Sequence, residues 1–79
     1  MYYNVEIAAY FDNENKYFKD WVLADYRDFR TKEDAIASIT PEYLEPNICG
    51  KRNTYRIIRV SQKTGKRRVV AEIFGEGEK

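Results

Sequence analysis

The sequence predicts an α+β fold: a four-stranded antiparallel sheet, in the order strand-strand-helix-strand-strand, with one helix packed on one face. Two pairs of apolar, alternating segments flank a single capped helical segment, and a short run of turn-forming residues joins the members of each pair. The chain of 79 residues has room for one small domain. We expect that domain to be ordered over residues 2–74, with residues 75–79 as a flexible tail.

The first strand is predicted over residues 2–11. Apolar side chains occupy its odd positions while Asn4 and Glu6 fall between them, which is the period of a half-buried strand. Asp12-Asn13-Glu14-Asn15 then supplies a run of turn formers that can reverse the chain.

Residues 17–29 fit two patterns. A strand is indicated by alternation, with Phe18, Val22, Ala24 and Tyr26 on one face and Trp21 and Leu23 on the other. A helical stripe fits as well, through Phe18, Trp21, Val22, Asp25 and Phe29. We favour a strand because β-branched and aromatic residues are enriched and because the segment follows a hairpin-like turn.

The helix is predicted to begin at Thr31. Thr31-Lys32-Glu33-Asp34 resembles a capping box, and its acids lie where the helix dipole favours them. Ala35, Ile36 and Ile39 supply a short apolar stripe. Pro41 ends this helix or starts a brief second turn after Thr40, and we expect Tyr43 and Leu44 to fold back on the core. Residues 45–53 read as loop.

The last two strands are predicted over residues 54–61 and 66–74, which alternate in period two. Gln62-Lys63-Thr64-Gly65 connects them, and its glycine can adopt the positive φ of a tight hairpin.

One short helix covers one face of such a sheet and leaves the other face bare. Trp21 is expected in the core, with an interface anchor as the alternative. Depending on the register, the candidates for the uncovered face are Tyr2, Tyr10, Tyr55, Ile57, Arg59, Val70 and Phe74. This much exposed apolar surface predicts self-association or docking of a partner.

Charge is strongly segregated along the chain although the net charge is +1. Residues 1–50 carry −5, residues 51–68 carry +8 with no acid among them, and residues 69–79 carry −2. Clustered charge of one sign attracts an oppositely charged partner. The candidate binding residues are these cations together with Tyr55, which is available to stack on a base: Lys51, Arg52, Tyr55, Arg56, Arg59, Lys63, Lys66, Arg67 and Arg68.

The composition argues against an enzyme. The chain has no His and a single Cys, Cys49, so it lacks the usual general base, a Cys-His pair and a multi-thiolate or His-ligated metal site. The acids Asp20, Asp25, Asp28, Glu33 and Asp34 read as solvated or capping residues, and no glycine motif of a phosphate-binding loop is present. We therefore expect no cofactor, no metal and no catalytic residue. The lone cysteine and the lack of an apolar span predict a cytoplasmic protein.

The order of elements and two stretches resemble small phage and prophage proteins that act against host defences, including some anti-CRISPR proteins. The stretches are residues 26–36, which lead from a strand into a capped helix, and residues 55–60, which open the basic hairpin. The resemblance implies a non-enzymatic inhibitor in a bacterial host cell that occupies a surface of a nucleic-acid-binding effector. It carries over no functional residue.

Three other interpretations stay open. The cations can simply keep an exposed edge strand soluble, or the protein can bind DNA or RNA directly. The last hairpin also looks like the C-terminal strands of small ribonuclease toxins, which implies roles in RNA cleavage for Tyr55, Arg56, Arg59, Arg67 and Arg68.

Overall fold

The computed structural model describes residues 1–13, 16–46, 50 and 52–77, and for residues 9–13 and 16–19 it describes the backbone alone. Strands β1 (Tyr2–Asn13), β2 (Lys16–Phe29), β3 (Thr54–Val60) and β4 (Arg67–Phe74) form one antiparallel sheet in the order β2-β1-β3-β4. Helix α1 (Lys32–Ala37) and the 3-10 turn η1 (Pro41–Leu44) connect β2 to β3. This confirms the α+β class and the predicted order of elements.

The second segment, for which strand and helix patterns competed, is a strand. It pairs with β1 from Asn13 opposite Lys16 to Tyr3 opposite Phe29, with two irregularities in register near Val5. Because β1 is paired on both sides, it lies inside the sheet, and β2 and β4 form the two edges.

Helix α1 begins where the capping box predicts it. The Thr31 hydroxyl accepts a hydrogen bond from the backbone N–H of Asp34 at 3.1 Å. Of the expected apolar stripe, Ala35 is fully buried and Ile39 packs against the core. Ile36 departs from that expectation because its side chain is 37% exposed. The helix is too short to bury more than one line of side chains.

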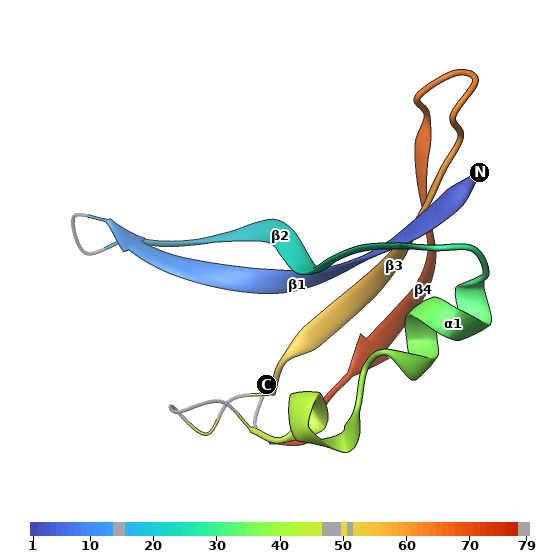
Figure 1. The fold of residues 1–79 in the computed structure, drawn as a ribbon. Coiled ribbons are helices and arrows are strands. Elements are labelled where there is room, and N and C mark those ends of the chain that lie inside the picture. The colour runs from blue at the N-terminus through green and yellow to red at the C-terminus, as the bar shows by residue number, and fades with distance from the viewer. Residues whose placement is uncertain (14–15, 47–49, 51, 78–79) are drawn as a thin grey trace.

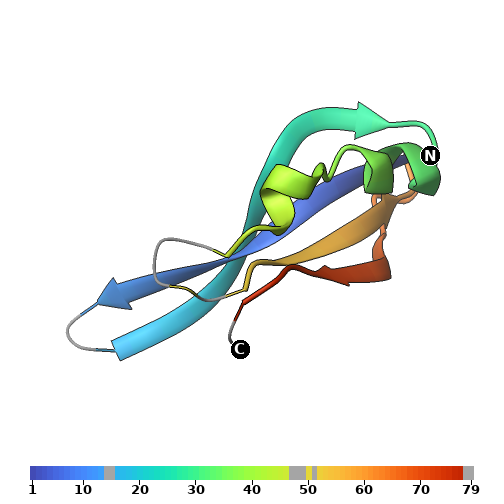
Figure 2. The same ribbon diagram turned by 90° about the horizontal axis from the view of Figure 1, so that it is seen from below.

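The core lies between α1 and one face of the sheet, as Figure 2 shows for the side on which α1 and η1 both lie. Val5, Ala35, Tyr55 and Ile57 form its centre, with Tyr55 and Ile57 only 2% and 0% exposed. Tyr55 and Ile57, two of the candidates for the uncovered face, therefore do not lie on it. The pairing Val5–Ile57 and Ile7–Tyr55 places both on the helix side, a register that alternation alone did not determine.

Two further candidates for the uncovered face also belong to the helix side. Val70 packs against the core. Arg59 is the cross-strand partner of Tyr3, and Tyr3 also packs against the core. Of the others, Tyr2 and Phe74 do lie on the opposite face by register. The side chain of Tyr10 lies outside the described part of the structure.

The face opposite α1 is called the open face here. Its residues follow from the strand pairing: Tyr2, Asn4, Glu6, Ala8, Trp21, Leu23, Thr54, Arg56, Ile58, Val60, Arg67, Val69, Glu72 and Phe74. Trp21, expected in the core, lies here outside the core cluster and is half-buried. The large apolar side chains Leu23, Val69 and Phe74 are 43%, 43% and 51% exposed on this face.

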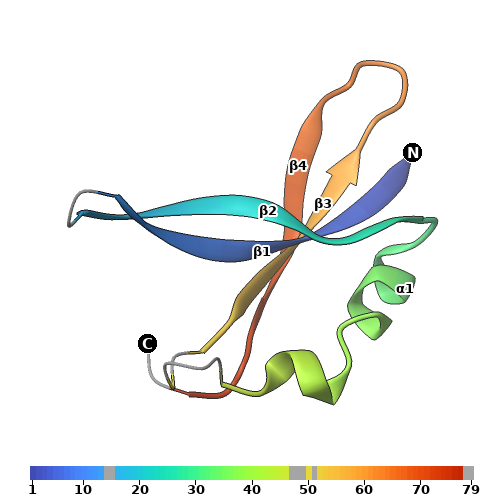
Figure 3. The same ribbon diagram turned by 60° about the vertical axis from the view of Figure 1, so that its left-hand side comes forward.

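The sheet divides into two hairpins, which are joined where the first half of β1 pairs with β3 and which diverge from there, as Figures 1 and 3 show. The β3–β4 hairpin turns through Gly65, whose φ of 71° confirms the predicted positive value. In the predicted loop 45–53, residues 47–49 and 51 lie outside the described residues, and so does the end of the tail. No helix in the described part is long and apolar enough to cross a membrane.

Candidate binding surfaces

The β3–β4 hairpin extends past the rest of the sheet, at the top of Figure 1. Ser61 and Lys66 close it, because the N–H of Ser61 donates to the Lys66 carbonyl at 2.9 Å and the N–H of Gly65 donates to the Ser61 carbonyl at 2.7 Å. Every residue from 62 to 69 is exposed. The backbone is thus held while the side chains around the turn face solvent.

Four of the predicted binding residues gather on this hairpin and are called the hairpin cations: Arg59, Lys63, Lys66 and Arg68. All four are exposed, and within the described part of the chain no carboxylate forms an ion pair with any of them. Arg59 and Arg68 are direct partners across β3 and β4. Like charges in that position repel each other. Because no described carboxylate pairs with the hairpin cations, their positive charge is unneutralised.

The other predicted binding residues are separated from this group. Arg52 lies at the far end of β3, with its guanidinium carbon 4.6 Å from the centre of the Phe74 ring. Tyr55 is buried and donates its hydroxyl proton to the Tyr43 carbonyl at 2.8 Å. Burial raises the pKa of that hydroxyl, which keeps it a donor. Tyr55 is therefore unavailable to stack on a base, and Lys51 lies outside the described residues.

Arg56 and Arg67 both bind Glu6 on the open face, and these three residues are called the charged triad. The Glu6 carboxylate accepts from Arg56 Nε at 2.7 Å and from the terminal nitrogen of Arg67 at 2.6 Å. Strand β3 lies between β1 and β4, so the Arg67 side chain crosses over β3 to reach Glu6. Ile58 of β3, on the same face, is only 2% exposed although α1 does not cover this face.

Glu6 is ionised at neutral pH. Burial raises the pKa of its carboxyl, but the hydrogen bonds and charges of Arg67 and Arg56 outweigh burial and leave the pKa below 4.5. One negative and two positive groups give the triad a net charge of about +1 at neutral pH. The guanidinium carbon of Arg56 also lies 4.2 Å from the centre of the Trp21 ring.

Sequence reasoning missed Glu6 as part of a site. Its place between apolar residues of β1 suggested a solvated position, yet the residue is 5% exposed. Glu6 is the partner of Arg56 across β1 and β3, which are far apart in the sequence. The available signal was the lone acid Glu6 in the predicted first strand together with two arginines, Arg56 and Arg59, in the third.

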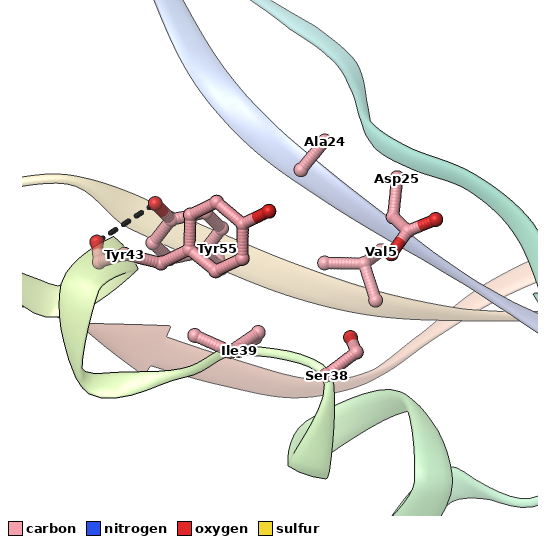
Figure 4. A pocket seen from close by; sticks show the side chains of 7 residues that line it. All are labelled: Val5, Ala24, Asp25, Ser38, Ile39, Tyr43 and Tyr55. Atoms are coloured by element: carbon pink, nitrogen blue, oxygen red, sulfur yellow. Dashed lines mark hydrogen bonds between the residues drawn. The ribbon is translucent and has the colours of Figure 1, made fainter.

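Among the described residues, one hollow is small and another is wide and open. Figure 4 shows a cavity between the segment that follows α1 and strands β1, β2 and β3, with the Tyr55–Tyr43 hydrogen bond at one side. Its volume of about 10 Å³ is about the least that can hold one water molecule. Its lining comprises Val5, Ala24, Asp25, Ser38, Ile39, Tyr43 and Tyr55. An open groove of about 500 Å³ runs between the end of β2 and α1 and carries both Arg and Asp side chains.

The carboxylates do not gather into a metal site: within the described residues no three His, Cys, Asp or Glu side chains are placed to hold an ion. Asp25 binds Arg27 at 2.7 Å, and Asp28 accepts from the Asn4 amide at 2.8 Å. Cys49 lies outside the described residues.

The chain matches no protein-family model, and neither the curated proteins nor the solved structures include one that it matches.

Proposed function

We propose that the protein is a non-enzymatic binding protein that docks through its β3–β4 hairpin on an acidic surface of a nucleic-acid-binding effector and inhibits it by occupying that surface. The unneutralised hairpin cations carry this proposal. Arg59 and Arg68 repel each other across the strands, and an external anionic surface removes that cost. The resemblance to phage anti-defence proteins supports the inhibitory role.

The burial of Tyr55 favours a protein surface over nucleic acid at the hairpin. With Tyr55 in the core, the hairpin offers cations without the stacking aromatic that recognition of single-stranded bases uses. The exposed acids of α1 and its flanks, among them Glu33, Asp34 and Glu42, also repel a polyanion that extends across the molecule.

The test compares two variants that remove the same charge. Lys66→Ala with Arg68→Ala removes one Lys and one Arg from the hairpin, and Arg30→Ala with Lys32→Ala removes one of each near the start of α1. Arg67 stays in place because it binds Glu6.

Each variant is used to capture proteins from a nuclease-treated bacterial lysate and is titrated against labelled DNA and RNA. We expect wild type and the α1-side variant to retain one shared effector that the hairpin variant loses, and we expect the hairpin changes to leave the affinity for naked DNA and RNA unaltered. Retention by both variants would contradict hairpin docking. Tight oligonucleotide binding that only the hairpin variant loses would instead favour a direct nucleic-acid-binding module.

A further inference from the structure

The open face holds a second positively charged group that the hairpin does not include. The charged triad lies on the face opposite α1, whereas Arg59 and Arg68 share a face with Tyr3 on the helix side. A role for the triad is therefore independent of the proposed docking through the hairpin.

The triad holds its guanidinium groups in place without using all their donors. Each guanidinium has five N–H groups, and Glu6 accepts from one nitrogen of Arg56 and one of Arg67. The Arg56 and Arg67 side chains are 25% and 51% exposed, so part of each group reaches solvent. Fixed, forked donors with a net positive charge are suited to the oxygens of a phosphate.

Aromatic rings adjoin Arg56 of the triad and Arg52, which lies outside it. Arg56 lies over Trp21 on the open face, and Arg52 lies over Phe74 at the far end of β3. A guanidinium held against a ring offers its outer side to a nucleobase, which stacks on arginine planes as it does on aromatic rings. An acidic peptide would use the charge but not this stacking surface.

We propose that the charged triad of Glu6, Arg56 and Arg67 is a phosphate-binding site for single-stranded nucleic acid, with Arg56 and Trp21 forming a stack that a base extends. Glu72 is the acid next to the triad by register, because it is the cross-strand partner of Arg56, and it forms no ion pair within the described residues. Its negative charge opposes the binding of a phosphate at the triad. Replacing Glu72 therefore tests the charge of the site without breaking the triad.

Trp21 is the only tryptophan of the chain, so its fluorescence reports on the site. The probes are inorganic phosphate, chloride as the control anion, a short oligothymidylate and an oligoglutamate peptide, all at constant ionic strength. We expect saturable quenching by oligothymidylate, with a Kd about five-fold lower in Glu72→Gln and about ten-fold or more higher in Arg67→Gln. The hairpin variant should keep this quenching, which separates the site from the proposed function.

Three results would overturn the assignment. Quenching by chloride as strong as that by phosphate would show that the triad only holds the sheet together. Binding of oligoglutamate as tightly as oligothymidylate would identify an acidic protein as the occupant. An Arg67→Gln variant that retains cooperative unfolding and wild-type affinity would show that phosphate binds elsewhere.

Discussion

At the scale of single residues, Glu6 decides how the open face is organised. A lone carboxylate in this half-apolar surface would be costly to bury, but two arginines from two other strands satisfy it. Because Arg56 and Arg67 bind Glu6, their side chains have different surroundings from those of Lys63 and Lys66, which are exposed on the hairpin. Six of the eight cations between residues 51 and 68 thus fall into two groups with different surroundings, the hairpin cations and the two arginines of the triad.

Glu6 should make stability depend on pH in the acid range. Its folded-state pKa lies below the ordinary 4.5, so the ionised group stabilises the fold above about pH 4.5, and this stabilisation is lost as pH falls through the folded-state pKa. We expect Glu6→Gln to lower the free energy of unfolding by about 1–3 kcal/mol at neutral pH. The difference from wild type should shrink in acid.

Urea unfolding of both proteins across this pH range measures the effect. Asp25→Asn is the control because the ion pair of Asp25 with Arg27 is more exposed, and it should cost under about 1 kcal/mol. A Glu6→Gln loss that stays constant from neutral to acid pH would contradict ionisation of Glu6 as its cause.

At the scale of elements, the sequence predicts what is local. Alternation located the strands to within about two residues, and the Thr31 capping box and Gly65 marked a helix start and a turn that the structure confirms. The cross-strand register is not local. It depends on how β1 meets β3 and on irregularities near Val5 and Ile57, so the sequence left open the face of Tyr55 and placed Trp21 in the core, outside which it lies.

The two threonines before α1 and η1 offer a matched test of capping. Thr31 accepts a hydrogen bond from the Asp34 N–H, whereas Thr40 precedes η1 without a side-chain cap. We expect Thr31→Ala to destabilise the protein by about 1 kcal/mol and Thr40→Ala to change stability by only a few tenths of that. Urea unfolding of the two variants measures these changes in stability. Equal losses of stability in both variants would contradict the capping role of Thr31.

At the scale of the whole molecule, the two hairpins make the fold extended. The radius of gyration is 13.6 Å, against about 12 Å for a compact chain of this length. Strand β1 pairs with β3 only from Tyr2 to Ile7, whereas its pairing with β2 continues to Asn13. Beyond Ile7 the sheet is therefore a two-stranded ribbon, which reaches out at the left of Figure 1.

This ribbon should be the least stable part of the sheet. Two strands alone are marginal in water because few neighbours support their hydrogen bonds, whereas residues 3–7 of β1 lie between β2 and β3 above the core. We expect the amides of residues 9–13 to exchange with solvent at least about ten-fold faster than those of residues 3–7 and of β3. Hydrogen exchange followed by NMR at two protein concentrations measures this. Uniform protection at the lower concentration would contradict the gradient, and protection of the ribbon that rises with concentration would show that a second copy covers it.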